Sequence, residues 1–252
     1  TDHTLLNVEQ IVQFADEADL NDVKETLQRQ IDCNTAIAKQ GLEGHWGAEI
    51  GRILLRSYGD SVHNRAKAWA AAGSDARMNG CELPVVINSG SGNQGLTITM
   101  PVLLYAEENQ VDHDSLLRAL AIANLMSIHQ KRFIGSLSAY CGATSAACAA
   151  AVGICWLQGG SYEQICGVIT NTLATLGGMW CDGAKSSCAS KIAAAVYTGL
   201  LSVRMSMNGH RFEQGEGIVT ASVEKTIQDV GHIAREGMRE ADLEILRLML
   251  KN

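Results

Sequence analysis

The sequence predicts an all-α protein of about ten helices with little or no sheet. Apolar residues recur three or four positions apart in almost every segment, for example at Leu117, Ala121 and Leu125. Residues that start and end helices flank these segments, and only two prolines interrupt the 252 residues. With 46% apolar residues the chain can bury a sizeable core, so we expect one helical domain over residues 1–252.

Capping residues mark the expected helix boundaries. Asn7, and either Asp112 or Asp114, precede apolar segments and are predicted N-caps, because their side chains can accept a hydrogen bond from the first helical turn. Gly41, Gly59 and Gly209 lie where helices are expected to end.

Two segments, residues 136–160 and 189–203, consist largely of Ala, Gly, Ser and Cys. Small residues let helix backbones approach closely, so both segments are predicted to be central, buried helices. The alternative is a membrane span, which the polar residues Thr144, Gln158 and Lys191 argue against.

The stretch between Pro84 and Pro101 departs from the helical pattern. Residues 88–95 are rich in glycine and predict a loop, and residues 96–99 after it are β-prone. The loop formally matches the spacing of the dinucleotide fingerprint, G-x-G-x-x-G. That motif requires a helix directly after its third glycine, and the β-prone residues followed by proline argue against one.

A second interpretation makes this loop a binding element for a small carboxylate. Successive backbone N–H groups can form an anion-binding nest, and nearby side chains add further donors. The predicted substrate-binding residues are Ser89, Gly90, Ser91, Gly92, Asn93 and Gln94. The remaining alternative is a flexible surface turn.

The net charge and the first residues of the chain indicate which partners and which cellular compartment to expect. The net charge of −7 disfavours nucleic acid or an anionic membrane as a partner. The first residues lack the basic and apolar regions of a signal peptide, so we expect a cytoplasmic protein with reduced cysteines. The chain begins with Thr1 instead of Met, which suggests a fragment or a processed product.

The eight cysteines include no C-x-x-C pair, so neither a zinc ribbon nor a thioredoxin motif is indicated. Cys33, Cys155 and Cys166 lie in apolar segments and are predicted to be packing residues.

Cys141, Cys181 and Cys188 differ because each lies at the edge of a glycine-containing turn that leads into a helix. The start of a helix lowers the pKa of a thiol and favours the thiolate that iron or zinc requires. These three residues are the candidate metal ligands, and the alternative is that they are packing residues like the other cysteines. Cys148 follows Cys141 with the same spacing that separates Cys181 from Cys188, but it lies within an alanine-rich run.

Asp182 and Lys185 lie between the second pair of cysteines and are the candidate catalytic residues. The alternative for both is a solvated face that caps the helix.

Three blocks of the sequence occur together. They are residues 74–102, which open with Ser-Asp-Ala-Arg-Met and contain the glycine-rich loop; residues 137–144, Leu-Ser-Ala-Tyr-Cys-Gly-Ala-Thr; and residues 178–188, Gly-Met-Trp-Cys-Asp-Gly-Ala-Lys-Ser-Ser-Cys. The combination resembles the serine dehydratase-like alpha family, specifically its L-cysteine desulfidase branch, which also holds many uncharacterised bacterial proteins. The resemblance spans nearly the whole chain, from about Gly41 to the C-terminus.

The resemblance implies a [4Fe–4S] cluster held by Cys141, Cys181 and Cys188, and no pyridoxal phosphate. The fourth iron would lack a cysteine and could act as a Lewis acid towards a small amino-acid substrate. The implied reaction is β-elimination on L-cysteine or L-serine. A base would remove the α-proton, and the aminoacrylate would hydrolyse to pyruvate and ammonia.

One departure limits what the resemblance implies. Relatives carry an additional N-terminal region with a Gly-Cys-Thr-Glu-Pro block, whose cysteine is a candidate catalytic group, and nothing in this chain matches it. We therefore expect the C-terminal part of a longer protein, or one piece of a split enzyme that needs a companion chain. A homo-oligomer is also compatible with the sequence. The alternative function is that of a non-catalytic helical member of the family, which binds a small molecule or zinc.

Overall fold

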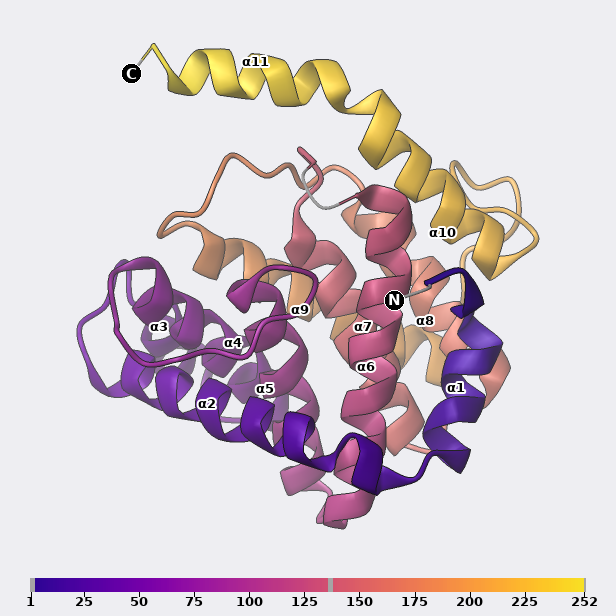
Figure 1. Ribbon diagram of the computed structural model, residues 1–252, viewed down its shortest axis with the longest axis horizontal. Coiled ribbons are helices and arrows are strands. Elements are labelled where there is room, and N and C mark those ends of the chain that lie inside the picture. The colour runs from indigo at the N-terminus through magenta and orange to yellow at the C-terminus, as the bar shows by residue number, and fades with distance from the viewer. Residues whose placement is uncertain (1–2, 136–137, 252) are drawn as a thin grey trace.

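The computed structural model describes residues 3–135 and 138–251, and within these ranges every regular element is helical (Figure 1). This confirms the predicted fold class. The α-helices are α1 (Val8–Glu17), α2 (Lys24–Glu43), α3 (Ile50–Tyr58), α4 (Val62–Met78), α5 (Gly92–Glu108), α6 (His113–Ile134), α7 (Gly142–Leu157), α8 (Tyr162–Leu176), α9 (Cys188–Met207), α10 (Val223–His232) and α11 (Arg239–Met249). Short 3-10 helices, η1 (His3–Leu5) and η2 (Leu20–Asp22), flank α1, and a π-helix, η3 (Ile233–Gly237), joins α10 to α11.

Two helices form the centres of the packing. Helix α7 contacts α5, α6, α8 and α9, whereas α4 contacts α2, α3, α5 and α9. Helices α5 and α9 therefore connect the α2–α4 side of the molecule to the α6–α8 side (Figure 1). Helix α11 has no buried residue and extends along the outside, beyond α10.

The two small-residue segments are central helices, as predicted. They correspond to α7 and α9, and residues 136 and 137 of the first predicted segment lie outside the described residues. A Cβ atom added at Gly153 of α7 would lie 2.9 Å from the carbonyl oxygen of Ala119. One added at Gly199 of α9 would lie 2.9 Å from that of Ala147. The absence of a side chain at these glycines thus permits close packing. No helix in the described ranges is long and apolar enough to cross a membrane.

Four of the five boundary predictions named above are confirmed. The side chains of Asn7 and Asp112 accept hydrogen bonds from the first turns of α1 and α6, and Gly59 and Gly209 follow the ends of α3 and α9. The prediction for Gly41 is wrong, because α2 continues to Glu43. A Cβ atom at Gly41 would lie only 1.9 Å from the carbonyl oxygen of Ala72, so this glycine serves close helix packing and does not end a helix.

The predicted loop and β-prone segment also need correction. The loop ends at Ser91, and α5 begins at Gly92 and includes both the β-prone residues and Pro101. This segment is enclosed by other helices, so a lone strand would leave its backbone groups without partners, whereas a helix satisfies them internally. The hydroxyls of Thr97 and Thr99 donate back to carbonyl oxygens one turn earlier, each at 2.7 Å.

Candidate functional site

A cavity of about 560 Å³ lies where the N-terminal ends of α5, α7 and α9 meet. All three predicted cysteine ligands line it, and so do five of the six predicted loop residues. Its full lining is Arg77, Ser89, Gly90, Ser91, Asn93, Gln94, Lys131, Ser138, Tyr140, Cys141, Gly142, Ala143, Cys181, Gly183, Ala184, Cys188, Lys191 and Ile192. Residues that are far apart in the sequence thus form one concave site.

A short backbone pairing brings Cys141 and Cys181 together. Tyr140 and Trp180 form an isolated antiparallel bridge, in which the N–H of Cys141 donates to the carbonyl oxygen of Met179 at 3.0 Å. The N–H of Cys181 donates to the carbonyl oxygen of Ala139 at 2.5 Å. Each cysteine directly follows a bridge residue, so their side chains leave the pairing on the same side.

Cys188 enters the cavity from a helix start. It is the first residue of α9, and Cys141 is the N-cap of α7, so both confirm the prediction that these thiols lie at helix N-termini. Cys148 occupies the interior of α7 and is fully buried, which shows that the repeated spacing does not reflect a repeated environment. The lowered thiol pKa expected at this helix start is not found for Cys141, because burial raises its pKa and outweighs the opposing hydrogen bond from the backbone of Ala143.

The loop before α5 is anchored and does not behave as a free surface turn. Asn88 and Ser91 exchange backbone hydrogen bonds of 3.1 and 3.0 Å around a two-residue turn, in which Ser89 and Gly90 both have positive φ. The side chain of Asn88 also donates to the carbonyl oxygen of Asn124 on α6, at 3.2 Å. Ser89 is a non-glycine residue in a left-handed conformation, and such strain is typical of functional loops.

Gly142, the first residue of α7, permits the side chain of Gln94 to approach closely. The amide nitrogen of the Gln94 side chain would lie 2.6 Å from a Cβ atom at Gly142, so Gln94 reaches across the first residue of α7 only because that residue is glycine. Gln94 is 6% exposed, and its Oε1 has no hydrogen-bond partner among the described residues. The hydroxyl of Tyr140, at 2% exposure, is equally without a partner there. Both residues line the cavity.

The charge of the lining is entirely positive. Arg77, Lys131 and Lys191 are its charged residues, and no carboxylate lines the cavity in the described ranges. Nη1 of Arg77 donates to Oδ1 of Asn93 at 3.3 Å, which directs the guanidinium towards the loop. The starts of α5 and α7 add positive potential, because neither N-cap side chain makes a capping hydrogen bond. The site therefore favours an anionic ligand.

Lys131 is the least compensated of these cations. It is 9% exposed, and in the part of the chain that the structure describes its amine makes no hydrogen bond or ion pair. Burial lowers the pKa of Lys131, and the nearby thiols of Cys181 and Cys141 oppose that shift.

Lys191 and the two predicted catalytic residues form an ion-pair group. Asp182 pairs with Lys191 at 2.5 Å and also with Lys185, and these hydrogen bonds, to Lys185 first, lower the pKa of Asp182 to about 2. Burial acts to lower the pKa of Lys191, but the hydrogen bond and the charge of Asp182, with the nearby thiols of Cys141 and Cys181, together outweigh it and the net shift is upward. Neither Asp182 nor Lys185 lines the cavity, so the structure places both at its edge.

The described residues contain no group of three or more His, Cys, Asp or Glu side chains arranged to hold a single metal ion. The three cysteines share the cavity, but they do not form a compact mononuclear site.

Comparison with known proteins assigns the family. A family model described as the serine dehydratase alpha chain matches residues 3–247. The chain belongs to the serine dehydratase alpha chain family. The predicted resemblance to this family is thereby confirmed.

Three curated relatives of this serine dehydratase alpha chain domain are each named UPF0597 protein. The relative from Desulfitobacterium hafniense is 52% identical over 250 residues, which are 99% of this chain and 58% of the relative. Those from Lachnoclostridium phytofermentans and Treponema denticola are 52% and 47% identical and are each covered to 60% of their length. The chain thus spans about three-fifths of the length of the curated relatives it matches.

Sequence reasoning missed two basic residues of the serine dehydratase alpha chain cavity, Lys131 and Lys191. Arg77, the third, lies in the first of the three sequence blocks that carry the resemblance. A signal for Lys131 exists, because it continues the buried stripe of α6 formed by Ala123 and Ser127 at four-residue spacing. A lysine in the buried phase of an amphipathic helix indicates a charged site. Of the predicted loop residues, Gly92 alone does not line the cavity, although it is the first residue of α5.

Proposed function

We propose that this chain is the cluster-binding part of an iron–sulfur-dependent lyase that removes the β-substituent of L-cysteine or L-serine without pyridoxal phosphate. The observation that carries the proposal is the single cationic cavity, which unites Cys141, Cys181 and Cys188 with the glycine-rich loop. Membership of the family supports a lyase-type role. The cluster and the two substrates are proposed in addition to that role.

The donor set is of the type that holds a [4Fe–4S] cluster, because three thiols face one cavity. Cluster ligands each bind a different iron and stand farther apart than the ligands of a mononuclear site. Basic side chains around the thiols compensate the negative charge of thiolates. When bound, the cluster would supply a Lewis acid towards the sulfur or oxygen on the β-carbon of the substrate.

The chain's own residues provide for both ends of an amino acid. Arg77 and the N–H groups at the start of α5 can hold a carboxylate, which both the charge and the helix dipole favour. The unpartnered Oε1 of Gln94 is a buried acceptor and can receive a hydrogen bond from the α-ammonium group. Burial raises the pKa of Tyr140 to about 12, so its unpartnered hydroxyl stays protonated and can donate to the substrate.

Lys131 is the group in this chain best suited to accept the α-proton. Its amine lines the cavity without a partner in the described residues, and burial favours the neutral form. Asp182 and Lys185 neutralise each other at the edge and are better suited to fixing the loop between Cys181 and Cys188. Loss of the α-proton and of the β-substituent leaves an aminoacrylate, which water converts to pyruvate and ammonia.

The part of the relatives that this chain does not cover, about two-fifths of their length, also enters the proposal. We propose that a region equivalent to it, in the same polypeptide or in a companion chain, completes the active enzyme. Cluster binding is the property that the present chain can be tested for directly.

Anaerobic reconstitution with iron and sulfide tests the proposal. We expect visible iron–sulfur absorption and close to four irons per chain, as the cluster formula requires. Cys181→Ser is expected to abolish the absorption. Cys148→Ala is the matched control, because Cys148 is buried in α7 away from the cavity, and it is expected to retain the absorption.

Two outcomes would refute the cluster. One is a folded, reconstituted protein without iron, and the other is a stoichiometric content of zinc after anaerobic purification, which would favour the non-catalytic alternative. Addition of L-cysteine or L-serine should perturb the visible spectrum even where turnover is absent, whereas L-alanine, which lacks a β-substituent that can coordinate, should not.

A further inference from the structure

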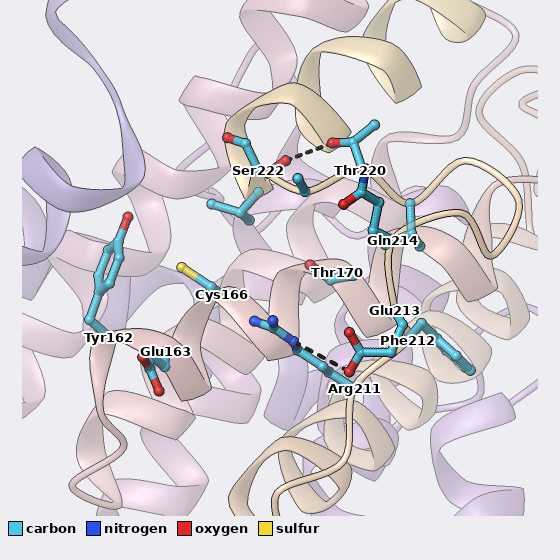
Figure 2. Close-up of a pocket in the computed structure, with 13 residues that line it drawn as sticks. Tyr162, Glu163, Cys166, Thr170, Arg211, Phe212, Glu213, Gln214, Thr220 and Ser222 are labelled. Carbon is cyan, nitrogen blue, oxygen red and sulfur yellow. Dashed lines mark hydrogen bonds and ion pairs between the residues drawn. The ribbon is translucent and has the colours of Figure 1, made fainter.

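We propose a second binding site, for a zwitterionic α-amino acid, in a cavity between α8 and the segment that joins α9 to α10. Figure 2 shows the residues that line this cavity. Its volume is about 470 Å³, and it shares no lining residue with the cysteine cavity. Pockets of this size are typical of small-molecule sites.

Arg211 provides the anion-binding group. Figure 2 shows its side chain extending into the cavity, with the guanidinium end pointing towards Cys166. Within the described residues the guanidinium makes no hydrogen bond, and its one ion pair, from Nε to Glu213, is long at 3.9 Å. The terminal nitrogens are therefore available for a bidentate pair with a carboxylate.

Thr170 is a second, independent polar group without a partner. It is only 8% exposed, it lines the same cavity, and its hydroxyl forms no hydrogen bond in the part of the chain that is described. A threonine inside a helix commonly bonds back to the carbonyl four residues earlier, as Thr172 does to Val168 at 2.7 Å. Thr170 forms no such bond, so its hydroxyl stays open to a hydrogen bond from a ligand in the cavity.

The backbone around Arg211 is held in place by Asn171, which lies next to Thr170 in α8. Asn171 is fully buried, and its side-chain nitrogen donates to the carbonyl oxygen of His210 at 3.1 Å. Its side-chain oxygen accepts a hydrogen bond of 2.9 Å from the N–H of Phe212. Asn171 thus fixes the backbone on both sides of Arg211. Because Asn171 is also the neighbour of Thr170, Arg211 and Thr170 are held in a defined arrangement.

The mixture of charges identifies the ligand class. Arg211 is the one basic residue among the described lining residues, whereas Glu163 and Glu213 are acidic. A simple anion would meet these carboxylates unfavourably. An α-amino acid can place its carboxylate on Arg211 and Thr170 and its ammonium group beside Glu213, so that both charges are paired.

Calorimetric titration with glycine, L-serine and L-cysteine tests this site. The background should be Arg77→Met, which removes the proposed carboxylate contact of the cysteine cavity, so that failure of the proposed lyase function would not affect the result. We expect binding of at least one of these amino acids, and a loss of about tenfold or more in affinity on Arg211→Met and on Thr170→Val. Arg29→Met on the exposed face of α2 is the matched control and should leave the affinity unchanged.

A second measurement locates the ligand. Cys166 lines the cavity, so bound amino acid should slow alkylation of Cys166 by iodoacetamide, resolved by peptide mass spectrometry. Thr170→Val preserves the shape of the side chain, so it keeps the test valid if Arg211→Met lowers the melting temperature.

Equal amino-acid affinities in Arg211→Met, Thr170→Val and their parent would overturn the site, as would the absence of binding by all three amino acids. Acetate that binds as tightly as glycine would overturn the assignment of a zwitterion.

Discussion

The hydroxyl of Ser186 donates a hydrogen bond of 3.0 Å to the side-chain oxygen of Asn79, across more than one hundred residues of sequence. Asn79 follows the end of α4, and its side-chain nitrogen donates to the carbonyl oxygen of Asp75 at 2.6 Å. The loop that carries Cys181 and Cys188 is thereby attached to the body of the protein at a point between its two cysteines.

Ser186→Ala should make a reconstituted cluster less durable. The substitution removes one hydrogen bond of about 1 kcal/mol and leaves Asn79 without that partner, so the loop moves more freely. We expect the visible absorption to bleach several-fold faster in air. Ser187→Ala is the control, because the adjacent serine makes no capping hydrogen bond. Identical bleaching rates for the two variants would contradict the anchoring role.

Lys131→Met should lower kcat by about 100-fold in the active enzyme while the iron content stays unchanged. Because burial lowers the pKa of Lys131, its neutral form is reached at a lower pH than for an ordinary lysine, and kcat/KM should rise with pH as that form appears. The variant should lack this rise. Lys131→Arg distinguishes the roles, because arginine keeps the charge but cannot release its proton. Full activity in that variant would show that Lys131 acts only as a cation.

Gly95→Ala should destabilise the protein by about 2 kcal/mol or more. A Cβ atom at this position would lie 2.0 Å from the carbonyl oxygen of Val86, and backbone cannot move aside as a flexible side chain can. Gly178→Ala is the matched control, because no atom lies within 4 Å of its added Cβ. Chemical denaturation measures both. A stable Gly95→Ala variant would show that the loop before α5 can shift freely.

Asp75→Asn should change how stability depends on pH. Asp75 is fully buried, and burial raises its pKa from 3.8 to about 6, while hydrogen bonds from the backbone of Gly51 and Ile50 oppose the shift. A carboxyl with a raised folded-state pKa contributes stability that is complete below pH 3.8 and is lost as the pH rises through 6. The free energy of unfolding of the parent, relative to that of the variant, should therefore fall by roughly 2 to 3 kcal/mol between pH 4 and 7. Parallel pH profiles would contradict a buried, protonated Asp75.

The fold class followed from the sequence because helical periodicity and N-caps are local features. Asn7 and Asp112 needed only the next few residues to act as caps. The errors lie where tertiary packing overrides local preference. Gly41 faces the backbone of Ala72, and the β-prone residues of α5 are enclosed on all sides, so neither outcome could be read from neighbouring residues.

The site was predictable in part for the same reason. The glycine-containing turns around Cys141 and Cys188 are local signals of helix starts, and the structure places both residues there. The convergence of these cysteines with the Ser89–Gln94 loop depends on how α5, α7 and α9 meet, which spacing alone does not encode. Lys131 and Lys191 were missed because their role as lining residues depends on how the helices meet around the cavity.

The lining of the cysteine cavity implies that this protein must fold before it can bind a cofactor there. Its charged and thiol groups come from α4, α6, the start of α7 and both sides of the Cys181–Cys188 loop, and span residues 77 to 191. No short stretch of nascent chain contains the complete set. A cofactor held by these residues can therefore be captured only after most of the polypeptide has emerged and collapsed, so maturation would follow folding and not guide it.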